Sequence, residues 1–156
     1  MKKILIILVI ILTAITVQTS AAYAQGAVKT GPDLSTLRDA DLEKDSLHNL
    51  EVARHYFKLK KAYVAAIKRC EEIDAGNPNF AKMDEVLFIA GESSLRLAEN
   101  RGKQKTKEKT AEQLRQDARV YLSRLVAGYP NSTFLKQAED DLKDLGGQIK
   151  LEGTQP

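Results

Sequence analysis

Two short segments of the chain, residues 75–79 and 127–131, share the pattern A-G-x-P-N and lie 52 residues apart. Each follows a stretch with apolar residues at three- and four-residue spacing, which is typical of a helix. Glycine can take the left-handed conformation that closes a helix, and proline cannot continue one. Residues on both sides match at the same offset: Ala66 with Ala118, Cys70 with Leu122, Ile73 with Leu125, Met83 with Leu135, Val86 with Ala138, and Ala90 with Leu142. Repeated helix ends between matched apolar positions predict stacked helical hairpins.

The remaining pattern predicts an all-α fold of about five helices, arranged as stacked antiparallel hairpins in a short α-solenoid. The first clear helix is expected from Leu47, with Asp45 or Ser46 as its N-cap, and a short helix over 35–43 precedes it. The third helix is expected over 81–99. The charged segment RGKQKTKEK, residues 101–109, is predicted to be a solvated loop or a polar helix extension.

The amino-terminal 24 residues have the pattern of an export signal. Lys2 and Lys3 precede an apolar run over 4–17, and a small-residue stretch ends in Ala22-Tyr23-Ala24, which matches an A-x-A cleavage site. We therefore expect a signal peptide (1–24), a linker with a short helix (25–42), a helical domain (43–146) and a flexible tail (147–156). The expected location is the periplasm; retention of the segment as an amino-terminal anchor is the alternative.

Composition narrows the function classes further. The formal net charge is +3 and falls to +1 without the two lysines of the export signal, so the chain lacks the clustered positive charge that nucleic-acid binding requires. The single cysteine, Cys70, cannot form an internal disulfide. It is also too far along the chain to carry a lipid next to the cleavage site.

The spacing of packing residues within one unit resembles a tetratricopeptide repeat (TPR), which has a period of about 34 residues. The residues that carry this resemblance are Leu50, Ala53, Phe57, Tyr63, Ala66, Cys70, Ile73 and Pro78. The wider text, from EKDSLHNLEVARHYFKLKKAYVAAIKRCEEI to YLSRLVAGYPNSTFLKQAEDDL, is similar to the BamD family of outer-membrane assembly lipoproteins. The chain lacks that family's lipid-bearing cysteine and the length for its five repeats.

This resemblance implies a non-enzymatic adaptor that binds a segment of another envelope protein, in outer-membrane protein assembly and in association with the outer membrane. In TPR proteins the first helix of each unit lines a groove. The equivalent residues here are His48, Glu51, His55 and Lys58 in the first unit, and Glu85, Phe88, Glu92 and Arg96 in the second. Mixed charge beside one exposed aromatic ring suits a peptide or a partner helix. An ordinary solvated helix face is the alternative interpretation.

Three further functions stay open on the sequence alone. One is a TPR-containing coordinator of the Tol-Pal and cell-division type, and another is a self-associating structural module. The third is an enzyme that uses a metal or a thiol, centred on His48, His55 or Cys70. The two histidines lie seven residues apart, too far for direct sharing of one metal ion on a straight helix.

No other catalytic motif is present in the sequence. It holds no glycine-rich phosphate loop, no G-x-S-x-G and no H-E-x-x-H. Cys70 lies in an apolar stripe, which favours a buried structural residue over a nucleophile. We therefore expect no enzyme activity, no cofactor and no metal. The lysines of the loop offer contact with anionic lipid or peptidoglycan, and a solvated loop is the simpler interpretation: Lys103, Lys105, Lys107 and Lys109.

Overall fold

The computed structural model describes residues 39–150, and within that range every regular element is a helix. This confirms the all-α prediction. The predicted export signal, the predicted linker up to residue 38 and the predicted tail beyond residue 150 lie outside the described residues. The elements are α2 (Ala40–Arg54), the π-helical turn η1 (His55–Lys60), α3 (Tyr63–Gly76), α4 (Met83–Ala98), α5 (Ala111–Gly128) and α6 (Leu135–Asp144).

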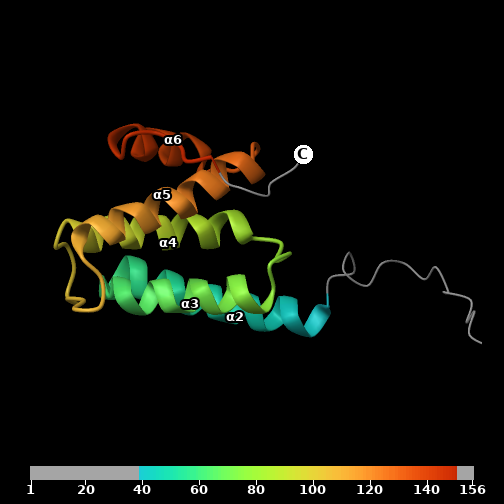
Figure 1. Cartoon of the computed structure of the whole chain (residues 1–156). Helices are drawn as coiled ribbons and strands as arrows, with labels where there is room; N and C mark the ends of the chain where they lie inside the picture. The colour runs from blue at the N-terminus through green and yellow to red at the C-terminus, as the bar shows by residue number, and fades with distance from the viewer. Residues whose placement is uncertain (1–38, 151–156) are drawn as a thin grey trace, which may run out of the picture. The chain divides into compact units, whose positions relative to one another are not determined.

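Each α-helix packs against the next one in the chain, which produces the expected stack (Figure 1). In Figure 1, α2 and α3 form the lowest layer, α4 and α5 the middle, and α6 lies on top. The helix α4 is central because it contacts α3 on one side and α5 on the other. Between residues 39 and 150, the structure contains no helix with the length and apolar character that a bilayer crossing requires.

The two A-G-x-P-N segments adopt the same backbone conformation. The residue before each proline is extended: Asn77 has φ −144° and ψ 74°, and Tyr129 has φ −133° and ψ 66°. The backbone N–H of each donates to a carbonyl four residues earlier, Ile73 at 2.8 Å and Leu125 at 2.9 Å. The turns that follow also match in their backbone hydrogen bonds. The N–H of Phe80 donates to the carbonyl oxygen of Asn77 (3.0 Å), as that of Ser132 does to Tyr129 (3.0 Å). The N–H of Met83 donates to the carbonyl oxygen of Phe80 (3.1 Å), as that of Leu135 does to Ser132 (3.2 Å).

The expected cause of these helix ends was wrong in one respect. Gly76 and Gly128 are the last helical residues and do not take the left-handed conformation. The prolines explain the stop, because proline excludes the helical conformation for the residue before it. The left-handed glycines in the described chain are Gly102, Gly146 and Gly147, and the last two follow the end of α6.

The start of the first helix also differs from the prediction. Asp39 is the N-cap of α2, and its carboxylate accepts hydrogen bonds from the N–H groups of Asp41 (2.9 Å) and Leu42 (3.3 Å). Ser46, expected as a cap, is buried in mid-helix, where its hydroxyl accepts a hydrogen bond from Asn77 at 3.2 Å. The helix α2 therefore begins at residue 40, inside the expected linker, because Asp39 caps it.

The long charged segment forms a loop between α4 and α5, one of its two expected forms. A capping box ends it: Gln113 N–H donates to Thr110 Oγ1 at 3.2 Å, and Thr110 N–H donates to Gln113 Oε1 at 2.8 Å. The third helix was expected over 81–99 and is observed as Met83–Ala98, which agrees within the fraying at its ends.

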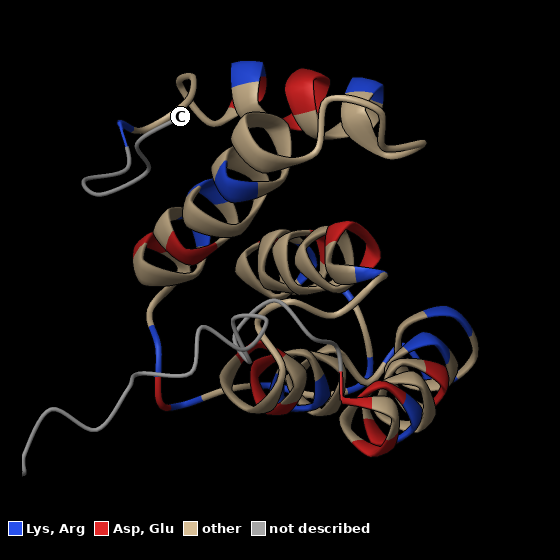
Figure 2. Cartoon of the chain, turned by 90° about the vertical axis from the view of Figure 1, so that its right-hand side faces the viewer, with Lys and Arg blue, Asp and Glu red and all other residues tan. Residues whose placement is uncertain are grey.

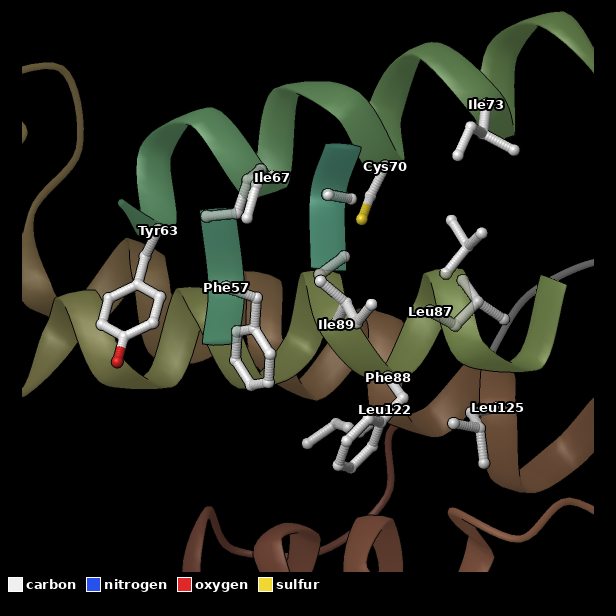
Figure 3. Close-up of a cluster of buried hydrophobic side chains, with 14 of the residues drawn as sticks. Phe57, Tyr63, Ile67, Cys70, Ile73, Leu87, Phe88, Ile89, Leu122 and Leu125 are labelled. Atoms are coloured by element: carbon white, nitrogen blue, oxygen red, sulfur yellow. The ribbon is translucent and has the colours of Figure 1, made fainter. Parts of the chain in front are cut away.

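The hydrophobic core is built around α4. Side chains from α3, among them Ile67, Cys70 and Ile73, face Leu87 and Ile89 of α4 (Figure 3). All residues from 86 to 94 are buried. This follows from the position of α4, which packs against α3 and α5.

Candidate functional site

The expected groove residues of the first unit lie on the surface. His48 and Glu51 are exposed on α2, and His55 and Lys58 are exposed on η1. They share one side of a helix whose opposite side carries the buried Leu50, Ala53 and Phe57. The four predicted groove residues of the first unit are therefore accessible to solvent.

Two groove residues of the second unit serve the packing of the stack. Arg54 of α2 donates to both carboxylate oxygens of Glu85, at 2.6 and 2.5 Å. This ion pair lowers the pKa of Glu85, and the charge of Lys58 lowers it further. Phe88, expected as the exposed aromatic of the groove, is instead buried and stacks on Phe134 with ring centroids 4.5 Å apart. That expectation was wrong because the start of α6 covers this side of α4.

The other two, Glu92 and Arg96, border a charged cleft of about 580 Å³ between α4, α5 and α6. We call it the α4–α6 cleft. Figure 2 shows acidic and basic segments along both α5 and α6. The cleft is lined by Glu92, Leu95, Arg96, Glu99, Arg101, Glu112, Arg115, Arg119, Gln137, Asp141, Asp144 and Leu145.

A pair of carboxyl groups, Glu92 and Asp141, lies at one wall of this cleft. Glu92 is only 4 % exposed; its carboxylate accepts from Arg96 at 2.6 Å and from Gln137 at 3.4 Å. Asp141 Oδ2 is buried and receives no N–H or O–H from other described residues. Burial raises the pKa of Asp141 to about 7, and the adjacent carboxylates of Glu92 and Asp144 add to the effect, while Arg96 opposes it. The raised pKa favours the protonated form of Asp141, and a hydrogen bond between its carboxyl group and Glu92 contributes to the shift.

Arg96 connects this carboxyl pair to the first hairpin. Its guanidinium lies over the ring of Phe57, 4.4 Å from the centroid, and 5.7 Å from the centroid of Tyr63. Its Nε is buried and has no acceptor among the described residues. Because the guanidinium is held by two rings and by Glu92, it positions that carboxylate rigidly.

The helix α5 contributes two arginines and one glutamate to the lining of the cleft. Arg119 donates from Nε and Nη2 to the carbonyl oxygen of Gly147, both at 3.2 Å, and so holds the segment after α6 in place. Arg115 is exposed and lies 3.6 Å from the carboxylate of Glu112. The cleft thus carries carboxyl groups from α4, α5 and α6 together with guanidinium groups from α4 and α5.

Reasoning from the sequence missed the α6 side of the site. Asp140 and Asp141 are neighbours on α6, and adjacent residues on a helix point in different directions. That geometry holds, since Asp140 is exposed and Asp141 turns inward. The available signal was the position of Asp141, three residues after Ala138 and one before Leu142, at the edge of the buried stripe.

The residues considered for metal or thiol chemistry lie elsewhere. Cys70 is 1 % exposed, and burial raises the pKa of its thiol far above the ordinary value, so the reactive thiolate is disfavoured. His48 and His55 are exposed on the outer side of α2 and η1. Across residues 39–150, no three side chains of histidine, cysteine, aspartate or glutamate are grouped so as to hold a metal ion.

Comparison with known proteins adds no family to these observations. No family model, curated protein or solved structure matches the chain.

Proposed function

We propose that this chain is a non-enzymatic periplasmic adaptor whose TPR-like stack of helical hairpins holds a segment of another envelope protein. The proposal includes a role in outer-membrane protein assembly, as in the BamD-like proteins that the sequence resembles. Export rests on the pattern of residues 1–24. The binding role is supported chiefly by one observation, the carboxyl pair Glu92 and Asp141 at the wall of the α4–α6 cleft.

The chemistry of this wall favours a cationic side chain of the partner as the group that is bound. Asp141 Oδ2 is buried without a donor, and a lysine or arginine of a partner segment would supply one. The incoming cation would displace the proton held by Asp141 into solvent, after which the carboxylate of Asp141 faces positive charge. The guanidinium groups of Arg115 and Arg119 would meet acidic groups of the same segment across the cleft.

The rigidity of the site contributes to affinity. Glu92 and Arg96 lie on the central helix, and Arg96 is held against Phe57. A cleft that exists before the partner arrives loses little conformational entropy on binding. The energy of each charged contact is therefore available for affinity and for selection among partners.

A crosslinking experiment in cells tests this function. A photoreactive amino acid replaces Glu112 at the rim of the cleft, or Lys44 on the exposed surface of α2 as a control. We expect position 112 to capture an exported protein through a segment that contains lysine or arginine. Asp141→Lys should abolish this capture, because it places a cation permanently against Glu92, whereas Asp140→Lys at the exposed neighbour should retain it.

Two results would contradict the proposal. Equal capture from both positions would indicate random encounter. Capture that survives Asp141→Lys would show that the carboxyl pair does not bind the partner.

The raised pKa of Asp141 makes binding depend on pH. The partner should bind more tightly at about pH 8 than at about pH 6, because Asp141 must lose its proton before it can pair with the cation.

A further inference from the structure

The end of the stack where α2 meets α3 carries a concentration of lysines from two distant parts of the chain. In Figure 1 the loop between α4 and α5 descends beside this end of the lowest layer. The first contribution comes from η1 and the residue after it, and the second from the loop: Lys58, Lys60 and Lys61, with Lys103 and Lys105. All five are exposed. We call this surface, together with Leu59, the basic tip.

Three contacts hold the loop against α3. The N–H of Lys103 donates to the carbonyl oxygen of Lys61 at 3.0 Å. Gln104 Oε1 accepts from the N–H of Ala65 at 3.2 Å, which caps the open start of α3. Gly102 has φ +101° and approaches Tyr63 so closely that a Cβ would lie 2.6 Å from the ring. The lysines of the two segments are therefore placed together by the fold.

Leu59 is the apolar member of this surface. It is 70 % exposed, the highest exposure among the exposed large apolar side chains of residues 39–150. It projects from the π-helical turn between Lys58 and Lys60, and the left-handed Lys61, with φ 51°, ends that turn. A protruding leucine ringed by lysines has the chemistry of an interfacial anchor: the apolar group enters the lipid and the ammonium groups meet the phosphates.

The charges at the basic tip are left unpaired by the residues that the structure describes. Within the described part of the chain, none of its five lysines lies in an ion pair, although Lys58 acts on Glu85 through its charge. By contrast, Lys109 at the far end of the loop is paired with Asp117 at 2.7 Å. We propose that the basic tip binds the surface of an anionic phospholipid membrane, with Leu59 inserted between the headgroups.

The absence of tryptophan from the chain permits a direct test. Leu59→Trp in the full chain creates a single tryptophan. Its emission reports on the surroundings of residue 59 alone, so contact of the apolar residues 4–17 with the vesicles gives no signal. Emission should shift to the blue on vesicles of phosphatidylcholine and phosphatidylglycerol, and not on pure phosphatidylcholine. The matched control is Leu47→Trp, at an exposed leucine on α2, whose emission should respond to neither.

Charge reversal tests the lysines. In the Leu59→Trp background, Lys60→Glu, Lys103→Glu and Lys105→Glu together should weaken binding to the anionic vesicles at least about 100-fold, since each lysine near such a surface contributes about fivefold. A control with the same change in net charge is Lys44→Glu, Lys136→Glu and Lys150→Glu, all at exposed positions. We expect the control to weaken binding less than about fivefold, because these charges lie farther from the lipid than a screening length.

Three results would overturn the proposal. The first is an unchanged emission of the Leu59→Trp variant on anionic vesicles. The second is an equal loss of binding in both triple variants, which would indicate attraction by net charge alone. The third is the same blue shift with soluble polyglutamate, which would assign the surface to an acidic polypeptide. Circular dichroism of each variant establishes that its helices are intact.

Discussion

Replacing Asp141 with asparagine isolates the energetic cost of the carboxyl pair in the α4–α6 cleft. The side chain keeps its size, and its amide gives Glu92 a permanent N–H donor. The pKa of Asp141 is about 7 in the folded protein against an ordinary 3.8, so the folded state holds the proton more tightly than the unfolded chain does. The stabilisation of the folded state by the proton on Asp141 is therefore complete below pH 3.8. It is lost as the pH rises through about 7.

The size of the effect follows from the same two values. A pKa of about 7 against 3.8 corresponds to an upper bound of about 4 kcal/mol of stability lost when Asp141 ionises. Solvent reaches part of this carboxyl group and screens its charge. We therefore expect the stability lost on ionisation to be about 1–2 kcal/mol, no more than half of that upper bound. Asp141→Asn should thus unfold at higher urea concentration than the parent protein at about pH 8, with a difference that nearly vanishes at about pH 4.

Urea unfolding followed by circular dichroism measures this difference across the pH range. Asp140→Asn is the matched control, because Asp140 lies next to Asp141, is exposed and accepts a hydrogen bond from Lys143 at 2.8 Å. That contact lowers the pKa of Asp140, so its removal should give no gain at high pH. A stability of Asp141→Asn that is equal to the parent at about pH 8, or a gain independent of pH, would refute the reasoning.

Three further experiments test the packing of the stack. In the same urea assay, Gly91→Ala should destabilise the protein by about 1–3 kcal/mol, because the added methyl would lie 2.7 Å from a leucine of α5. Gly128→Ala, where the added methyl meets nothing within 4 Å, should be neutral or stabilising. The side chains of Arg124 and Asp74 join α5 to α3 through two hydrogen bonds of 2.6 and 2.7 Å. A double-mutant cycle on Arg124→Ala and Asp74→Ala should therefore give a coupling free energy of about 0.5–1 kcal/mol, and purely additive losses of stability would contradict this. A thiol reagent should modify Cys70 at least about 10³-fold more slowly in the native protein than in urea, because reaction requires unfolding; rapid native labelling would place the thiol outside the core.

Much of the helical framework could be predicted from the sequence because its causes are local. The prolines at 78 and 130 end α3 and α5 by acting on the residue before them, and this effect depends only on adjacent residues. The apolar spacing that placed Ala66 and Ala118 in the interior also held, and both are fully buried. The one clear error in a boundary was the start of α2, where the cap formed by Asp39 went unrecognised.

The sites were harder to predict because they depend on which helices meet. The sequence indicated Glu92 and Arg96 as surface groove residues, and the structure brings them against Asp141 and Gln137, which lie some 45 residues farther along the chain. No periodicity in α4 alone reveals that α6 covers Phe88 and leaves a cleft beside Glu92. The shift in the pKa of Asp141 arises from this juxtaposition, since it requires burial by one element and charge from another.

The sequence by itself therefore determined the class of fold and the helix ends, because hydrogen bonds between near neighbours, capping and the conformational limits of proline act over a few residues. Only the tertiary structure decided where charge collects. The loop containing Lys103 reaches the end of η1 through a backbone hydrogen bond to Lys61, 42 residues away. Electrostatic potential depends on distance in space, and helix packing sets that distance, so the α4–α6 cleft and the basic tip are both products of the stack.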